Sequence, residues 1–354
     1  MRVLVVTNDY PPRPGGIQQY LGNLVAHSSA EILVLGPSDA GAADDQGIVR
    51  GHARYMLPSR RTRAWVERYV EEFSPDVIVF GAPHPLAQLG PGLTRKTGIP
   101  YVVVAHGAEV TLPAALPGLR QILGRTFRHA ALVFTVSAFT ERRVEAIGSH
   151  ATAVLGAGVD LDSFRPRKRD ANGTVRLICV SRFVPRKGHL RVIRAAEVIA
   201  AAGQPTEVVI VGRGRLEMRI RRAADRASVP VAIEVEVPWE RLPDAYGNAD
   251  IFVMPARSRW FGLEVEGLGI VYLEAAAAGL PVIAGRSGGA PETVVPGETG
   301  YLAESVPEII EAVRLVMEHP ADLGHAGRAR AEERYGWQSV ANRFDAALDR
   351  LISA

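Results

Sequence analysis

The chain has 354 residues and a formal net charge of +3, and 47% of its residues are hydrophobic, 22% charged and 6% aromatic. This composition is typical of a soluble globular protein with about two domains, and it excludes a disordered or fibrous chain. A net charge this small does not indicate a nucleic-acid partner, and we expect none. The single cysteine, Cys179, excludes an intrachain disulfide, and no apolar run approaches the roughly 20 residues that span a bilayer. We therefore expect a cytoplasmic protein whose contact with membranes is at most peripheral.

Short β-branched runs alternate with amphipathic helical stretches along the first half of the chain: "VLVVT", "EILVLG", "DVIVFG", "YVVVAH" and "LVFTVS". This alternation predicts a parallel sheet covered by helices. The polar stretch "GAGVDLDSFRPRKRDANGT" interrupts it, and further strands follow at "VRLICVS", "EVVIVG", "VAIEVEV", "DIFVMPA" and "PVIAG". The sequence thus predicts an α/β protein with two doubly wound, Rossmann-like domains facing a cleft. We expect domains over residues 1–160 and 174–334, a hinge over 161–173, and a final helix over 335–354 that packs back on the N-terminal domain.

Loops at the carboxyl ends of the strands are the candidate sites, because ligands of open α/β sheets bind there. In the first domain, Gly15 and Gly16 precede a helix, where backbone amides without side-chain bulk can bind an anion. A plain tight turn is the alternative. His106 and Glu109 lie at the tip of the fourth strand, although a histidine on an apolar strand is more often structural.

Two cations follow the first strand of the second domain, in "CVSRFVPRKG". Arg182 donates hydrogen bonds in a fork and Lys187 acts as a point charge, so the pair can neutralise a diphosphate. Solvated surface charge is the alternative for this pair.

The stretch "EVVIVGRGRLE" contains two glycines of a dinucleotide fingerprint, Gly212 and Gly214, but Glu217 replaces the third. Glu236, about 20 residues further on, keeps a nicotinamide cofactor open as an alternative. We count Gly212 among the donor-binding candidates.

Two carboxylates flank a glycine-rich turn in "EVEGLGIVYLEAAAAG". The stretch predicts a helix that begins near Gly269 and ends at Gly279. Glu266 then precedes the helix and Glu274 lies in its second turn, both near the positive helix end. A carboxylate accepts two hydrogen bonds from a vicinal diol, so Glu274 suits a ribose and Glu266 suits a sugar. A chance pair on a solvated helix face is the alternative.

The motifs "GGIQQY", "AHGAE", "VSRFVPRKG", "DIFVMPARSR" and "EVEGLGIVYLEAAAAGLPVIAGRSGGAPETV" resemble those of glycosyltransferase family 4, which has the two-domain GT-B fold. The resemblance covers nearly the whole chain. It is strongest to actinobacterial GDP-mannose-dependent phosphatidylinositol monomannoside mannosyltransferases, through "VPRKG" and "EVEGLGIVYLEA". It implies a retaining hexosyltransferase without metal or separate cofactor, with GDP-mannose as donor and a glycolipid or small molecule as acceptor.

The same resemblance implies roles for individual residues. The residues implied to bind the nucleotide-sugar donor are Gly16, Arg182, Lys187, Gly212, Glu266, Gly267, Leu268, Gly269 and Glu274. Those implied to act in catalysis are His106, Glu266, Arg182 and Lys187, with His106 near the anomeric centre. Those implied to face the acceptor, in the N-terminal domain, are Asp9, Tyr10 and Gln18.

The chain also departs from the family pattern, and other functions remain open. "HGAE" stands in place of "HGHE", and Trp260 and Phe261 replace a more glycine-rich stretch. A nonhydrolysing sugar-nucleotide epimerase, a glycosyltransferase with another donor and a soluble acceptor, an NAD-dependent oxidoreductase and a catalytically silent nucleotide-sugar-binding protein are the alternatives.

Two basic stretches predict a surface for anionic lipid. No acidic residue occurs between Val110 and Thr140, and apolar residues recur there at helical spacing beside Arg120, Arg125, Arg128 and His129. Arg60, Arg61 and Arg63 precede Trp65 on a second candidate helix. Such helices can lie on an anionic membrane, so we expect peripheral contact at the inner leaflet. Helices that simply pack on the sheet, with solvated arginines, are the alternative.

Overall fold

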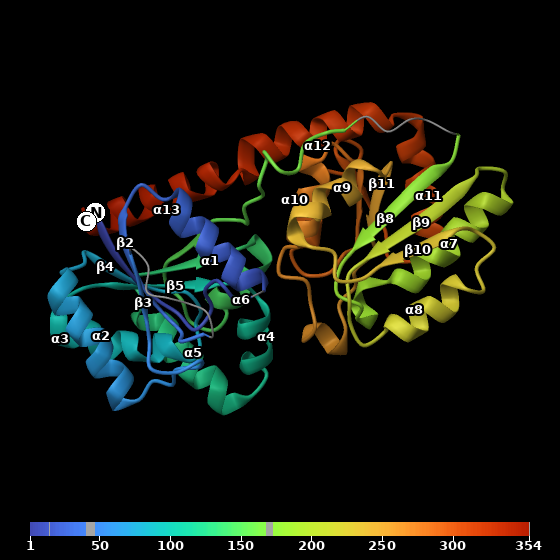
Figure 1. Ribbon diagram of the computed structural model, residues 1–354. Helices are drawn as coiled ribbons and strands as arrows, with labels where there is room; N and C mark the ends of the chain where they lie inside the picture. The colour runs from blue at the N-terminus through green and yellow to red at the C-terminus, as the bar shows by residue number, and fades with distance from the viewer. Residues whose placement is uncertain (14, 40–46, 168–172, 354) are drawn as a thin grey trace. The chain divides into compact units, whose positions relative to one another are not determined.

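The computed structural model describes residues 1–13, 15–39, 47–167 and 173–353 (Figure 1). The chain divides into two compact units, residues 1–158 with 337–354 and residues 159–336. Each unit holds a parallel sheet covered by helices, which confirms the predicted fold class. The chain leaves the first unit after Gly158 and re-enters it at Trp337. By this division the expected hinge at 161–173 begins inside the second unit, and its residues 168–172 lie outside the described residues.

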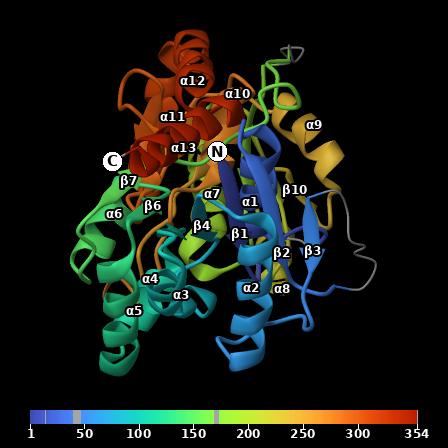
Figure 2. The same cartoon turned by 90° about the vertical axis from the view of Figure 1, so that its left-hand side faces the viewer.

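The described part of the first unit has a seven-stranded sheet in the order β3-β2-β1-β4-β5-β6-β7, and Figure 2 shows β1, β2 and β3 side by side. Its strands are β1 (Arg2–Val6), β2 (Glu31–Gly36), β3 (Ile48–Arg50), β4 (Val77–Phe80), β5 (Tyr101–Ala105), β6 (Leu132–Thr135) and β7 (Thr152–Val154). Its helices are α1 (Gly16–His27), α2 (Arg60–Phe73), α3 (Gly90–Thr97), α4 (Ala108–Ala114), α5 (Pro117–His129), α6 (Ala138–Glu145) and α13 (Trp337–Ile352). Residues 3–6 of β1 pair in parallel with 32–35 of β2 and 77–80 of β4, which places all three carboxyl ends at one edge.

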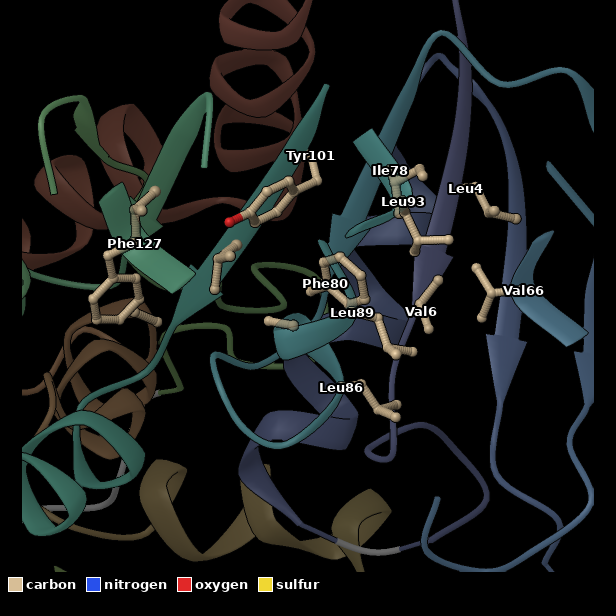
Figure 3. Packing of buried hydrophobic residues seen from close by; sticks show 14 of the residues in the cluster. Leu4, Val6, Val66, Ile78, Phe80, Leu86, Leu89, Leu93, Tyr101 and Phe127 are labelled. Atoms are coloured by element: carbon tan, nitrogen blue, oxygen red, sulfur yellow. The ribbon is translucent and has the colours of Figure 1, made fainter. Parts of the chain in front are cut away.

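A core of aliphatic and aromatic side chains fills the space between this sheet and the helices on one of its faces (Figure 3). Leu4, Val6, Ile78 and Phe80 come from the central strands, and Phe80 packs edge-on against Tyr101. Strands buried this completely contain almost only apolar residues, and for this reason they were visible in the sequence.

The second unit, in its described part, has a six-stranded parallel sheet in the order β10-β9-β8-β11-β12-β13. Its strands are β8 (Val175–Val180), β9 (Thr206–Val211), β10 (Val231–Glu234), β11 (Ile251–Met254), β12 (Val282–Ala284) and β13 (Gly300–Leu302). Its helices are α7 (His189–Ala201), α8 (Glu217–Ala224), α9 (Leu242–Gly247), α10 (Ile270–Ala277), α11 (Val306–Glu318) and α12 (Pro320–Tyr335). Short 3₁₀ turns η2 (Pro185–Lys187) and η4 (Trp260–Gly262) lie in the loops after β8 and β11.

The last helix, α13, packs against α1 in the first unit. The Asp345 carboxylate accepts hydrogen bonds from the hydroxyls of Ser28 and Ser29 and from the backbone amide of Ser29, at 2.5–2.8 Å. This confirms that the C-terminal helix packs back on the N-terminal part of the chain.

Candidate functional site

Three charged side chains of the second unit meet where β8 and β11 end. The Lys187 ammonium lies 2.6 Å from Oε2 of Glu266, and the Arg186 guanidinium donates a hydrogen bond to the same oxygen. All three side chains are at most 12% exposed. The fold therefore brings Lys187 and Glu266 together although 79 positions separate them in the chain.

The protonation of this cluster follows from the balance between burial and pairing. Burial alone would raise the pKa of Glu266, but attraction and hydrogen bonding to Lys187 and Arg186 outweigh it and lower the pKa to about 2. Burial lowers the pKa of Lys187, and Glu266 opposes this shift. Glu266 is thus a fixed carboxylate at neutral pH.

The cluster has an excess of positive charge. Arg186 also lies 3.9 Å from Glu264, which pairs at 3.3 Å with Arg259, so three cations face two carboxylates. Because the cations outnumber the carboxylates, this arrangement favours an added anion such as a phosphate.

The backbone around Glu266 is held by the loop after β12. The Glu266 amide donates to the Ser287 hydroxyl at 3.1 Å, and the Gly289 amide donates to the Glu266 carbonyl at 3.0 Å. A Cβ at Gly288 would lie 1.9 Å from the Glu266 carbonyl oxygen, so this close approach requires glycine. Of the turn that follows, Leu268 is buried, while Gly267 and Gly269 are half-buried. Gly269 is the N-cap of α10, as predicted, with φ 94°.

Glu274 lies in the second turn of α10 but has a different partner. It is 3% exposed, and its Oε2 accepts a 2.6 Å hydrogen bond from the Tyr246 hydroxyl on α9. Burial raises the pKa of Glu274 to about 7, and the bond from Tyr246 opposes that rise. The two carboxylates of the glycine-rich turn therefore differ in protonation: Glu266 is paired with cations, and Glu274 titrates near neutrality.

The second cation of the cluster is one that the sequence analysis missed. Arg182 is exposed, and the guanidinium beside Lys187 belongs to Arg186. The signal was present in "VPRKG", where Arg186 directly precedes Lys187, but only the fold shows which arginine reaches Glu266.

The two glycines of "VGRGR" have a packing role. A Cβ at Gly212 would lie 2.1 Å from the Ser181 carbonyl oxygen, and one at Gly214 would lie 2.9 Å from the Phe183 amide nitrogen. Both have positive φ, 138° and 152°. They allow the loop after β9 to approach the loop that carries Arg182, which accounts for the Gly-x-Gly pattern without a nicotinamide cofactor.

A second polar cluster lies at the strand ends of the first unit. The Gln18 amide donates to Asp9 at 2.6 Å, and Nε2 of His106 donates to the Gly81 carbonyl at 2.9 Å. Burial raises the pKa of Asp9. His106 and Arg13 oppose this rise, and the nearby Glu109 adds to it, so the pKa of Asp9 depends on all three neighbours.

Other predicted residues of the first unit lie around this cluster. The Glu109 carboxylate accepts hydrogen bonds from the backbone amides of His106 and Gly107. Gly16 begins α1, and among the described residues no atom apart from its chain neighbours and the backbone of its own helix lies within 4 Å of where its Cβ would stand. Tyr10 is buried, and the Arg50 guanidinium lies over its ring.

Two features are absent from the described residues. No group of three or more histidine, cysteine, aspartate or glutamate side chains there could hold a metal ion. In the same residues, no helix combines the length and apolar character that crossing a membrane requires.

Comparison with known proteins identifies the family. The model "Glycosyltransferase Family 4" matches residues 14–163, and "Glycosyl transferases group 1" matches residues 162–334. A GDP-mannose-dependent monoacylated alpha-(1-6)-phosphatidylinositol monomannoside mannosyltransferase of Corynebacterium glutamicum is 38% identical, over 97% of this chain and 96% of the relative. The chain belongs to glycosyltransferase family 4. A second relative of this glycosyltransferase, the GDP-mannose-dependent alpha-(1-6)-phosphatidylinositol monomannoside mannosyltransferase of Mycolicibacterium smegmatis, is 39% identical over 97% of both chains.

Solved structures show that the fold of this glycosyltransferase is shared more widely. Sucrose-phosphate synthase from Thermosynechococcus elongatus superimposes with a TM-score of 0.79 over 99% of both chains, at 19% identity. The Anabaena protein HepE, solved in complex with UDP, also gives 0.79 over 99% of this chain and 100% of its own, at 18% identity. The glycosyltransferase is thus an enzyme with the GT-B fold, as predicted from its motifs.

Proposed function

We propose that this glycosyltransferase transfers mannose from GDP-mannose to a hydroxyl of a phosphatidylinositol mannoside-type glycolipid, with retention of anomeric configuration. The observation that carries the proposal is the buried Glu266 carboxylate, held by Arg186 and Lys187 at the carboxyl ends of β8 and β11. Relatives 37–39% identical over 97% of the chain are GDP-mannose-dependent mannosyltransferases that act on phosphatidylinositol monomannosides, which supports the choice of donor and acceptor.

In this proposal the donor diphosphate lies against Lys187 and the exposed Arg182, both in the second unit. Lys187 then exchanges part of its contact with Glu266 for a phosphate oxygen. Glu266 becomes available to accept hydrogen bonds from the mannose hydroxyls, while Arg186 keeps it ionised. The excess positive charge around Glu266 favours this exchange because the incoming diphosphate is the missing anion.

Glu274 binds the ribose diol of the donor. Its Oε2 already accepts from Tyr246, so Oε1 is the oxygen offered to the ribose. The amides of Gly267, Leu268 and Gly269 approach the sugar and its phosphate at the start of α10, where the helix dipole favours negative charge. Gly212 acts by packing the loop that carries Arg182.

The chemical step forms a bond from the acceptor hydroxyl oxygen to the anomeric carbon on the face that the diphosphate leaves. The bond from the anomeric carbon to the diphosphate breaks, and the acceptor proton passes to the departing phosphate oxygen. The second unit acts mainly by placing charge: Lys187 and Arg182 on the leaving group, and Glu266 beside the oxocarbenium-like sugar. His106 of the first unit has the catalytic role that the family resemblance implies. Asp9, Tyr10 and Gln18 belong to the acceptor side.

Helix α5 is the proposed contact with an anionic membrane at the inner face of the plasma membrane. Leu123 and Phe127 are buried in the core, whereas Arg120 and Arg125 are exposed together with Ile122, which is 41% exposed. Leu116, which precedes the helix, is 57% exposed. A helix with exposed apolar residues beside basic ones suits the boundary between headgroups and acyl chains.

A donor panel tests this function. The protein is incubated with GDP-mannose, UDP-glucose or UDP-N-acetylglucosamine, with and without a phosphatidylinositol monomannoside acceptor, and the sugar products and released nucleotide are quantified. We expect transfer with GDP-mannose only and in the presence of acceptor. Epimerised nucleotide sugar without acceptor, or transfer from a UDP-sugar alone, would refute the proposal.

A further inference from the structure

Tyr20, in the second turn of α1, is 2% exposed and touches three separate segments of the first unit. Its ring lies edge-on to the His106 ring, with centroids 5.0 Å apart and an interplanar angle of 84°. It also lies edge-on to Trp337, at 5.5 Å and 72°. Its hydroxyl donates a 3.0 Å hydrogen bond to the Gly156 carbonyl. One buried side chain thus joins the candidate catalytic histidine to two distant parts of the chain.

Both distant parts are the segments through which the chain passes between units. The first passage follows Gly158, two residues after Gly156, and the return begins at Trp337. The Trp337 ring covers Gly158 so closely that a Cβ there would lie 2.1 Å from a ring carbon. Arg343, on the same helix as Trp337, donates to the Leu155 carbonyl at 2.6 Å. The two passages are therefore fastened to each other within the first unit, and Tyr20 lies against both.

His106 itself is held at two points. Its Nε2 donates to the Gly81 carbonyl, and its backbone amide donates to Glu109. These bonds fix the strand tip and one edge of the imidazole, and the Tyr20 ring packs against the imidazole edge-on. Edge-to-face pairs of this kind have a preferred geometry, so the Tyr20 ring restricts the orientation of the imidazole. Burial raises the pKa of the Tyr20 phenol, which therefore stays neutral and serves as a donor to Gly156.

We propose that Tyr20 is a positioning residue, which sets the orientation of the His106 ring and links it to the segments at Gly156–Gly158 and Trp337. The proposal rests on the role of His106 given under the proposed function. Tyr20 does not touch the substrate in this account; it acts through His106. Misplacing a reacting or stabilising group by about 1 Å can cost about 10²-fold in rate, so this restraint is large enough to matter.

Tyr101 offers a matched control within the same unit. It is equally buried, packs edge-on against Phe80 at 5.8 Å, and donates its hydroxyl to the Thr126 carbonyl at 2.5 Å. It lies at the opposite end of β5 from His106, roughly 16 Å away along the strand. Substitutions of Tyr20 and Tyr101 therefore remove the same kind of contacts, but only those at Tyr20 remove a contact with His106.

The experiment compares Tyr20→Leu, Tyr20→Phe, Tyr101→Leu and Tyr101→Phe with the wild type. Folding is checked by the melting temperature, and transfer is measured as kcat and KM for the donor. The His106 ring signals are followed by NMR on protein with ¹³C-labelled histidine, and they are assigned by their loss in His106→Gln.

We expect Tyr20→Leu to shift the His106 ring signals and to lower kcat about tenfold or more, with donor KM within about twofold. Tyr20→Phe keeps the aromatic ring, so its His106 ring signals and its kcat should match those of the wild type. The Tyr101 variants should leave the His106 signals in place. If Tyr20→Leu does not fold, Trp337→Phe is used instead, because Trp337 also packs against Tyr20. The Trp337→Phe variant should shift the same His106 ring signals.

Unchanged His106 signals in a folded Tyr20→Leu or Trp337→Phe variant, or equal shifts in Tyr101→Leu, would overturn the positioning role. A His106→Gln variant with wild-type kcat would instead refute the catalytic role of His106, and the ring signals of Tyr20→Leu would then decide the positioning claim alone.

Discussion

At the residue scale, Glu266 and Glu274 show how neighbouring carboxylates acquire different properties from their partners. The sequence predicted both positions, at a strand end and in the second turn of a helix. It did not predict that Arg186 joins Lys187 on Glu266, or that Tyr246 binds Glu274, because these contacts span 80 and 28 residues and depend on how the loops fold. The residue types of a site can thus be predicted from a local pattern, whereas its ion pairs cannot.

Lys187 should be needed for turnover. Replacing Lys187 with alanine removes a preorganised charge from the leaving group, so kcat should fall about 10²-fold or more. Arg194→Ala is the control, because Arg194 is an exposed cation paired with Glu197 on α7 and should keep wild-type activity. Steady-state transfer kinetics measure both variants. Equal activity of Lys187→Ala and Arg194→Ala would show that Lys187 is a structural charge.

Glu274 should make stability depend on pH. Its carboxyl has a pKa of about 7 when folded against 4.5 ordinarily, so the folded chain binds the proton more tightly. The contribution of Glu274 to the free energy of unfolding is then full below pH 4.5. It falls as the pH rises toward 7, by about 1.4 kcal/mol per pH unit at most. Glu274→Gln cannot titrate and should abolish this fall while weakening donor binding.

Urea unfolding of the wild type and Glu274→Gln at pH 4.5, 6 and 7.5 measures the effect. Glu236→Gln, at an exposed carboxylate paired with Arg213, is the control and should follow the wild type. A constant stability difference between wild type and Glu274→Gln across this range would show that Glu274 does not titrate there.

At the element scale, the strands that lie in longer apolar runs were predictable, and the edge strands β3, β7 and β13 were not. The runs "EILVLG" and "VRLICVS" correspond to β2 and β8. The strands β3, β7 and β13 have three residues each, as does β12, but each of them lies at the edge of its sheet and pairs with one neighbouring strand, whereas β12 lies between two strands. The hairpin around η4 could not be predicted either, because Trp260 and Phe261 adopt left-handed conformations, with φ 50° and 53°, that such residues rarely take.

This hairpin should become more stable when its aromatic residues are replaced. Arg259 and Glu264 pair through both backbone amides, and Trp260 and Phe261 form the exposed tip. Left-handed backbone costs such residues roughly 1–2 kcal/mol each, whereas asparagine and glycine accept it readily. Trp260→Asn combined with Phe261→Gly should therefore raise the free energy of unfolding by about 1 kcal/mol or more. Phe261→Ala removes the ring without relieving the backbone and should give no gain; a lower stability of the double variant in urea unfolding would contradict the argument.

Helix α5 should carry much of any binding to anionic lipid. Reversing the exposed Arg125 to glutamate changes the charge by two, so affinity for anionic vesicles should fall about tenfold or more. Arg222→Glu on α8 of the second unit is the charge-matched control. Sedimentation with phosphatidylinositol-containing and neutral vesicles, at low and high salt, measures binding. Equal loss in both variants, or no preference of the wild type for anionic vesicles, would favour a soluble acceptor.

At the scale of the whole molecule, the two units hold different candidate residues for the proposed reaction. The second unit holds the cluster of Glu266, Arg186 and Lys187, and the first holds His106, Asp9 and Gln18. The alternation of strands and helices was enough to predict two doubly wound units. The predicted end of the first domain at residue 160 and the predicted start of the final helix at residue 335 each lie two residues from the exchange points at Gly158 and Trp337.

The most direct test of the proposed function is the structure of the product formed from GDP-mannose and a phosphatidylinositol monomannoside. Purified wild-type protein is incubated with both, and the glycolipid is analysed by mass spectrometry and by NMR of its anomeric protons. We expect the addition of one hexose in α configuration, with the product absent in Glu266→Gln. A β-linked product, or no glycolipid product while the same preparation transfers sugar from another donor, would contradict it.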